Sequence, residues 1–245
     1  MQEIIKTTLI GLFFGTFGTT IGGIIGITLN KPSNKLLSLV LSFASGLMTS
    51  VVCFELIPEA MQISEFQNII YGIIFGIVTM IICDITVQKK INNKAKHNTN
   101  SLLKTGIIVS VGLAIHNFPE GLAIGSGFEA SIKLGLSLAI AIALHDVPEG
   151  IAMAVPMKNG GMNTSKVLIY VILSGVTTAV GALFGAIIGI ISQDIISICL
   201  SFAAGAMLYI VSGELIPESN KLYSGKTNAI GNIAGFIIGI IVSKI

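Results

Sequence analysis

The sequence predicts an all-α polytopic membrane protein with eight transmembrane helices in a 3+2+3 arrangement, and three observations lead to this prediction. First, 53% of the residues are hydrophobic and 11% are charged, with a mean hydropathy of +0.90, which is too apolar for a soluble domain. Second, apolar windows of about 20 residues, the length that crosses a bilayer, recur along the whole chain. Third, one segment occurs twice.

Taken in order, the apolar windows predict helices near residues 4–29, 35–58, 69–87, 104–127, 133–157, 166–191, 194–217 and 228–244. The first window continues through Leu29 without a small-residue cleavage site, so we interpret it as a span and not as a signal peptide. The only long polar connection, at about 88–103, follows the third helix.

The distribution of lysine orients these helices. Eleven of the fourteen basic residues lie in or beside the first, third, fifth and seventh connections. Because cytoplasmic loops carry the excess of positive charge, these connections are expected inside the cell, the 88–103 loop among them. Both chain termini are then extracytoplasmic, and the protein is expected to be a multi-pass protein of the cell membrane.

The duplicated segment relates the two ends of the chain. Residues 41–60 and 200–219 are identical at twelve of twenty positions. The second helix runs outward and the seventh inward, so the two copies have inverted orientations, as in transporters built from inverted repeats. Helices one to three and six to eight are therefore the expected halves. Helices four and five lie between them, where such folds place their substrate sites.

Two related hexapeptides lie in the middle of the fourth and fifth predicted helices: HNFPEG at residues 116–121 and HDVPEG at 145–150. An ionisable side chain at the bilayer centre costs at least about 2.5 kcal/mol, so such a cluster requires a compensating cation, proton or water. Since residues four apart share a face of a helix, each motif presents its histidine and its glutamate to one point.

If the two helices pack side by side, His116, Glu120, His145 and Glu149 converge as four nitrogen and oxygen ligands. This set suits Zn²⁺, Fe²⁺, Mn²⁺, Co²⁺ or Cd²⁺. The alternative for any one histidine is an interior hydrogen bond without a metal, and the matched pair of motifs argues against it.

Further polar residues extend the candidate site. Asn117 and Asp146 each lie three residues before a motif glutamate and predict an adjacent oxygen-rich pocket. Four glutamates of the repeat, near opposite membrane surfaces, predict stations along a cation path, and helix-end anchoring is an equal alternative. They are Glu55 and Glu59 outside, and Glu214 and Glu218 inside.

These features resemble the ZIP (Zrt-, Irt-like protein) family of divalent metal transporters, and within it the bacterial GufA-like branch. The resemblance rests on the paired motifs, the eight spans, the termini outside and the loop after the third span, and it covers residues 1–245 as a single ZIP-like domain. It implies zinc uptake into the cytoplasm, with Fe²⁺, Mn²⁺, Cd²⁺ and Co²⁺ as further cargoes. The metal is then a transported ion, and no cofactor is expected.

The resemblance also implies roles for residues. The motif histidines and glutamates form the primary metal site, Met48 touches it, and Asn117 and Asp146 belong to a second site that shares the glutamates. Many family members add a glutamate from the sixth span, but this chain has Thr178 at that position, so the second site is expected to be weak or absent. Family loops after the third span are often rich in histidine, whereas this one has only His97.

Finally, the resemblance implies an elevator-type carrier in which spans one, four, five and six move against the other four. A homodimer in the lipid bilayer is expected, with divalent metal ions as partners and no nucleic acid. Two alternatives stay open. One is an intramembrane zinc hydrolase, although the sequence lacks the His-Glu-x-x-His motif. The other is transport of a different substrate with the histidines as a proton relay.

Overall fold

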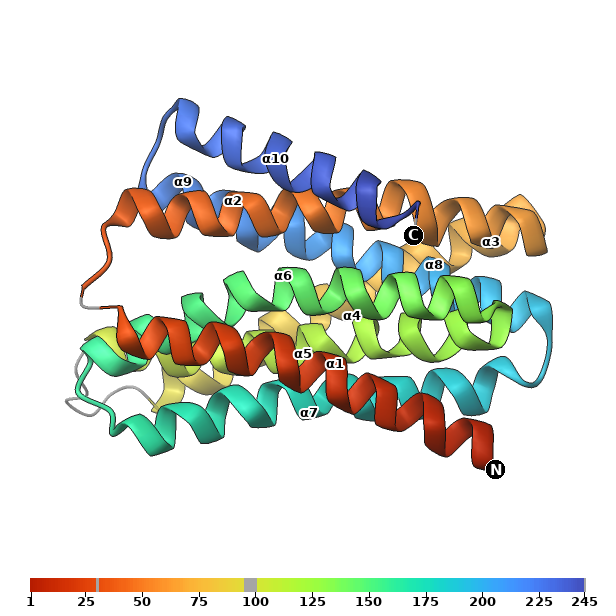
Figure 1. The fold of residues 1–245 in the computed structure, drawn as a ribbon, viewed down its shortest axis with the longest axis horizontal. Coiled ribbons are helices and arrows are strands. Elements are labelled where there is room, and N and C mark those ends of the chain that lie inside the picture. Colours follow the sequence, from red (N-terminus) through yellow and green to blue (C-terminus); the bar gives the residue numbers. More distant parts are fainter. Residues whose placement is uncertain (30, 95–100, 245) are drawn as a thin grey trace.

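The computed structural model describes residues 1–29, 31–94 and 101–244, and within these ranges the chain forms helices and no β-strand. The helices lie along one common direction, and the two chain ends lie at the same end of the bundle (Figure 1). In order they are α1 (Gln2–Thr28), α2 (Asn34–Val51), the π-helix η1 (Val52–Leu56), α3 (Ile57–Ile63), α4 (Phe66–Lys94), α5 (Ser101–Ala130), α6 (Ile132–Asn159), α7 (Thr164–Gly189), α8 (Gln193–Ile210), the π-helix η2 (Val211–Leu215), α9 (Ile216–Leu222) and α10 (Lys226–Val242).

Six helical segments of the described chain have the length and hydropathy that membrane crossing requires. They are α1, the continuous α2–η1–α3 segment, α4 as far as Thr86, α6, α7 and the continuous α8–η2–α9 segment. The predicted class, an all-α polytopic membrane protein, is confirmed. Helices α5 and α10 occupy the positions predicted for the fourth and eighth spans.

The predicted polar connection at about 88–103 is shorter than expected. Helix α4 continues to Lys94 and α5 begins at Ser101, so both ends of the predicted loop are helical. A hydropathy window detects only the apolar part of a helix, whereas backbone hydrogen bonds continue through polar residues such as those at the end of α4. Residues 95–100, with His97, lie outside the described residues.

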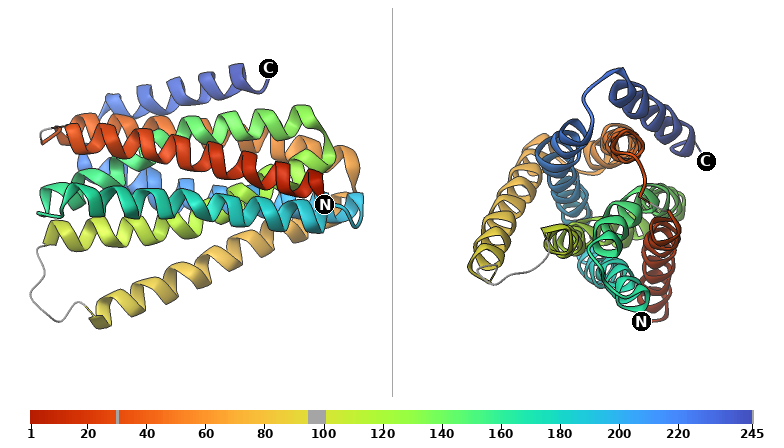
Figure 2. Two further views of the ribbon diagram at one scale, coloured as in Figure 1. Left: turned by 60° about the horizontal axis from the view of Figure 1, so that its bottom comes forward. Right: turned by 90° about the vertical axis from the view of Figure 1, so that its left-hand side faces the viewer.

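The helices form two groups, and each group contains helices from separate parts of the chain (Figure 2). One group packs α1, α5, α6 and α7 against one another, and the other pairs α2 with α10 and α4 with α8. The groups meet mainly where α5 lies against α8 and α2 lies against α6. The hexapeptide helices α5 and α6 therefore belong to one group and form its boundary with the other.

Close glycine contacts show that the repeat is longer than the duplicated segment. A side chain at Gly76 of α4 would collide with the backbone of Phe202 on α8, and one at Gly235 of α10 would collide with the backbone of Phe43 on α2. Gly76 and Gly235 are separated by the same number of residues as Phe43 and Phe202. Small residues let helices approach closely where lipid provides no hydrophobic drive, so equivalent glycines preserve equivalent packing.

The two π-helices are also equivalent in the repeat, and the hydropathy pattern does not predict them. In η1 the backbone N–H of Ile57 donates to the carbonyl of Val52, five residues back, and Ile216 makes the equivalent bond in η2. Pro58 and Pro217 follow directly. Because proline lacks an N–H and its ring crowds the carbonyl four residues back, the wider turn accommodates it.

Candidate metal centre

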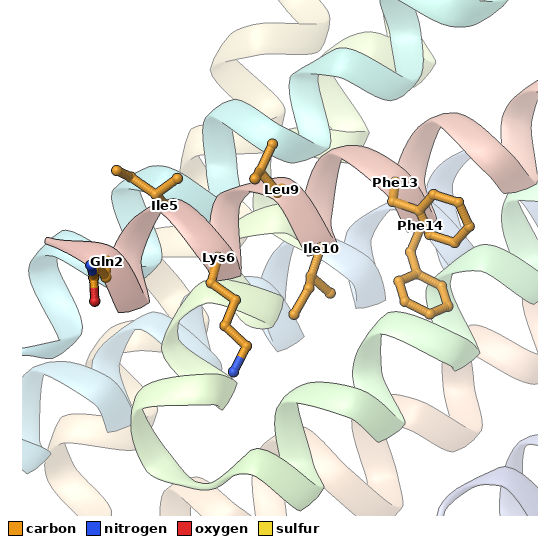
Figure 3. Close-up of a pocket in the computed structure, with 7 residues that line it drawn as sticks. All are labelled: Gln2, Ile5, Lys6, Leu9, Ile10, Phe13 and Phe14. Atoms are coloured by element: carbon orange, nitrogen blue, oxygen red, sulfur yellow. The ribbon is translucent and has the colours of Figure 1, made fainter.

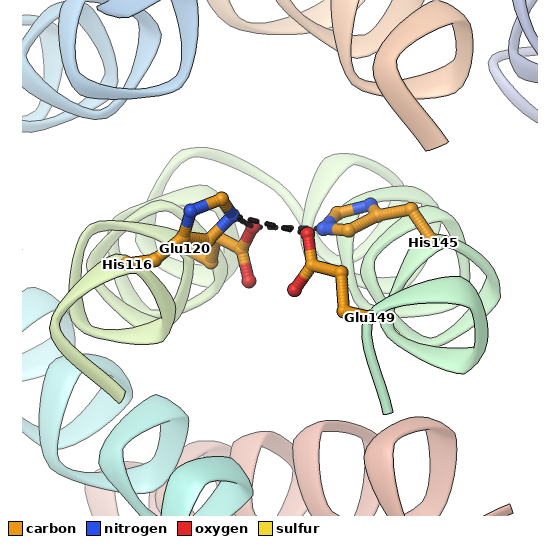
Figure 4. Close-up of side chains that lie close together, drawn as sticks. All are labelled: His116, Glu120, His145 and Glu149. Carbon is orange, nitrogen blue, oxygen red and sulfur yellow. Dashed lines mark hydrogen bonds and ion pairs between the residues drawn. The ribbon is translucent and has the colours of Figure 1, made fainter. Parts of the chain in front are cut away.

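Helices α5 and α6 bring four side chains to one point, as Figure 4 shows. Each of the four offers one ligand atom, and these atoms all lie within 4.8 Å of one another. Their exposed fractions are between 0% and 1%. The four residues are His116, Glu120, His145 and Glu149.

Glu120 lies at the centre of the cluster. Its Oε1 atom is 3.0 Å from Nε2 of His116 and 2.7 Å from Nε2 of His145. Nε2 of His116 is also 3.2 Å from Oε1 of Glu149, on the other helix. A single cation at this point would replace these contacts and be held from both helices.

The backbone of α6 orients one of the imidazole rings. Nδ1 of His145 lies 3.1 Å from the carbonyl oxygen of Ala141, one turn earlier. An Nδ1–H group that donates to this carbonyl leaves the lone pair on Nε2, the atom that faces the cluster. Metal-binding histidines are usually held in this way, so the ring is prepared for a metal without a further side chain.

The cluster has more buried acceptors than protein donors. Oε2 of Glu120, Oε2 of Glu149 and Nδ1 of His116 are buried, and none has a hydrogen-bond partner among the described residues. Removing one carboxylate from water without a partner costs several kcal/mol. Two glutamates carry the charge that neutralises one divalent cation, so the donor set fits such an ion.

Comparison with known proteins agrees with this geometry. The Zip family, described as ZIP Zinc transporter, matches residues 84–243. The proteins named zinc transporter ZupT from Corynebacterium aurimucosum and from Campylobacter jejuni are 33% and 32% identical to the chain, with 83% and 88% of both proteins covered. The chain belongs to the ZIP family.

A third relative matches the chain over a shorter stretch. The zinc transporter ZIP11 from Xenopus tropicalis is 38% identical over 140 residues, which cover 54% of this chain and 42% of that protein. Membership of the ZIP family makes the chain a transporter and not an enzyme, so the intramembrane hydrolase is no longer a competing interpretation.

A second group of polar residues lies on the neighbouring face of the ZIP hexapeptides. Asn117 points to α7, where its Nδ2 group donates to the carbonyl of Ser174 at 3.0 Å, and its Oδ1 atom is buried without a partner. The Cβ atom of Asp146 packs against α1, where a side chain at Gly18 would lie 2.7 Å from it, and its Oδ1 atom lies 3.8 Å from Nε2 of His145. Both carboxylate oxygens of Asp146 are buried without a hydrogen-bond partner.

Thr178 lies on α7, one turn after Ser174, the residue that binds Asn117. It is fully buried, and its hydroxyl has no partner among the described residues. A side chain at Gly15 of α1 would lie 2.6 Å from this hydroxyl. The position at which the family resemblance implies a glutamate is thus occupied by a neutral group in a tight contact, and a weak or absent second site stays a prediction.

The remaining predicted residues lie outside the four-residue cluster. Met48 of α2 is fully buried in the main apolar core. Glu55 is buried in η1, where it accepts a hydrogen bond from Ser137. Glu218 lies 3.0 Å from Lys221, three residues later, a contact that fits the helix-end alternative. Glu59 and Glu214 are half-buried.

Three groups that hold predicted site residues were not indicated by the sequence. They are the Ala141 carbonyl beside His145, the Ser174 carbonyl beside Asn117 and the Ser137 hydroxyl beside Glu55. Serine is common in membrane helices, and a backbone carbonyl leaves no signal in the sequence.

The apolar hollow in Figure 3, formed by α1 residues such as Ile5 and Phe13, shares no residue with the cluster.

Proposed function

We propose that the chain carries Zn²⁺ across the cell membrane into the cytoplasm, with Fe²⁺, Mn²⁺, Cd²⁺ and Co²⁺ as weaker or alternative cargoes. The ion binds at the cluster of His116, Glu120, His145 and Glu149. The observation that carries this proposal is the convergence of two imidazoles and two carboxylates in a fully buried place, with carboxylate oxygens that lack partners. The zinc transporters among the relatives support zinc as the cargo.

The proposal includes a topology. Eight spans of one domain, residues 1–245, cross the membrane in the 3+2+3 order. They are α1, the α2–η1–α3 segment, α4, α5, α6, α7, the α8–η2–α9 segment and α10. Both termini are extracytoplasmic, and the 88–103 connection is cytoplasmic. The lysine distribution supports the orientation, and the position of both chain ends at one end of the bundle supports an even number of crossings (Figure 1). Assembly as a homodimer rests on the family resemblance.

Alternating access by relative movement of the two helix groups is the proposed mechanism. All four ligands lie on α5 and α6, which belong to the same group, so the group can move without breaking the cluster. Met48 lies on α2, in the other group. A contact between Met48 and the ion would therefore form in only part of the cycle.

Two pairs of glutamates mark the proposed path. Glu55 and Glu59 lie on the extracytoplasmic side of the cluster, and Glu214 and Glu218 lie on the cytoplasmic side. Glu214 is within electrostatic range of His116. Among the described residues, it has no side-chain hydrogen bond like the one between Glu55 and Ser137. Glu214 is thus the better-placed station for release.

Zinc flux into proteoliposomes that contain a zinc-sensitive dye tests the proposal. The wild-type protein is expected to transport Zn²⁺, and His116→Ala is expected to lose most of the flux because one ligand is missing. Glu3→Gln, at an exposed position, is the matched control and is expected to keep it. Zinc binding by the wild type without flux, or full flux in His116→Ala, would contradict the proposal. Flux of protons without any metal binding would favour the proton-relay alternative.

A further inference from the structure

A small polar cavity lies away from the His/Glu cluster, at the end of the bundle that holds the chain termini. Its volume is about 160 Å³, and it lies between η1, α3 and the beginning of α6. Oxygen-bearing side chains line much of it: Glu55, Glu59, Gln62, Ser131, Ser137 and Ser243.

Glu55 is the residue that makes this cavity unusual. Only 5% of it is exposed, and its Oε2 atom is buried without a partner among the described residues. Its Oε1 atom accepts a hydrogen bond of 2.9 Å from the Ser137 hydroxyl. A buried carboxylate with one unsatisfied oxygen requires a cation or a proton, whereas helix-end anchoring would leave it in contact with solvent.

The hydrogen bond joins the two helix groups. Glu55 belongs to the α2–η1–α3 segment, and Ser137 belongs to α6, which carries half of the metal cluster. The Ser137 oxygen also lies 3.4 Å from the carbonyl of Val242 on α10. The hydroxyl has one hydrogen, so it has a second acceptor available if Glu55 turns away.

The cavity lies on a line with the cluster. Ser137, Ala141 and His145 are each four residues apart and share a face of α6, so about 12 Å separates the cavity from the cluster along this helix. Val52 of η1 and Leu138 and Ala141 of α6 are fully buried apolar residues of these two helices.

The other repeat lacks this arrangement. Glu214 is equivalent to Glu55, but it is half-buried. No side-chain hydrogen bond to Glu214 is present among the described residues, whereas Glu55 has its bond with Ser137.

We propose that Glu55 captures a divalent cation on the extracytoplasmic side, and that its hydrogen bond with Ser137 is a latch between η1 and α6 which the cation releases. This inference rests on the proposed orientation and movement of the groups. An incoming cation binds the Glu55 carboxylate, with Glu59 and Gln62 as further oxygen donors. The Ser137 hydroxyl then donates to Val242 on α10, so η1 is released from α6 while α6 keeps its contact with α10.

Uptake kinetics test the capture role. Glu55→Gln keeps an oxygen acceptor for Ser137 but removes the charge, so KM for Zn²⁺ is expected to rise about three- to tenfold. Lys133 also lines the cavity and is exposed, and Lys133→Gln removes a repelling charge, so KM is expected to fall. A KM in Glu55→Gln equal to that of the wild type would overturn the capture role.

Thiol labelling tests the latch. Cys53, which is exposed, is first changed to serine. The variant Leu138→Cys is then treated with a membrane-impermeant maleimide from the extracytoplasmic side. Labelling of this cysteine is expected to increase when Ser137→Ala is added. Zn²⁺ is expected to increase the labelling when residue 55 is glutamate, but not in Glu55→Gln. Labelling that neither change alters would overturn the latch.

The two proposals fail in different ways. If wild-type protein transports no zinc, the proposed function and this inference fall together. If it transports zinc while Glu55→Gln and Ser137→Ala behave like the wild type, only this inference falls.

Discussion

Helices α5 and α6 carry polar residues on two neighbouring faces, and the two faces differ in how their residues meet. On the first face, four ligand atoms from both helices lie within 4.8 Å of one another. On the second face, the Asn117 amide donates to α7, whereas the Cβ atom of Asp146 packs against α1. The same hexapeptides thus supply one point where four side chains converge and one face whose residues contact different helices.

The difference shows what a cation site requires beyond buried polar groups. The first face holds two carboxylates and two imidazoles, which match the charge and the ligand preference of a divalent metal. The second face holds one carboxylate, an amide that already donates to Ser174, and the Thr178 hydroxyl. We therefore expect substitutions on the first face to have much larger effects than those on the second.

The largest effect is expected from Glu120→Gln combined with Glu149→Gln. The amides keep the size of the side chains but lose both charges, so the affinity for Zn²⁺ should fall at least about 100-fold. Isothermal titration of purified protein measures this change. A double variant that binds zinc like the wild type would show that the converging face is not the metal site.

A change of pH should affect the first face next. The metal binds neutral imidazole and ionised carboxylate, so protons compete with it, and affinity is present at neutral pH and lost as the pH falls. Between about pH 7.5 and about pH 5.5, the zinc affinity is expected to fall at least about tenfold. Titrations in two buffers measure it, and equal affinities would contradict binding through histidine.

The first face was largely predictable from the sequence, and the second was not. The spacing of His116 and Glu120 places both on one side of a helix whatever surrounds them. Asn117 depends instead on which helix packs against it, and its partner is a backbone carbonyl of α7. A carbonyl is present at every residue, so no sequence pattern marks this one.

The same reasoning separates the predictable parts of the fold from the rest. Hydropathy located the helices because bilayer crossing requires long apolar segments. The equivalence of α4 and α10 was expected from the duplicated segment, and the contact glycines Gly76 and Gly235 agree with it. Hydropathy missed η1 and η2, because a wide turn changes the hydrogen bonding without changing the composition.

A smaller effect is expected from Asp146→Asn on the second face. Asp146 Oδ1 lies 3.8 Å from Nε2 of His145, so the loss of its charge should weaken zinc binding about three- to tenfold through electrostatics. Asp194→Asn, at an exposed position, is the matched control. A loss as large as that of the double glutamine variant would mean that Asp146 binds the ion directly and that both faces form one site.

The smallest effect is expected from Ser174→Ala. Asn117 Nδ2 lies 3.0 Å from the Ser174 carbonyl and 3.3 Å from its hydroxyl, and the substitution removes only the more distant acceptor. Because the carbonyl still holds the amide in place, zinc uptake should change less than about twofold. A tenfold loss in the same uptake assay would show that the hydroxyl itself contributes to the function of the second face, and the two faces would then differ less than their geometry indicates.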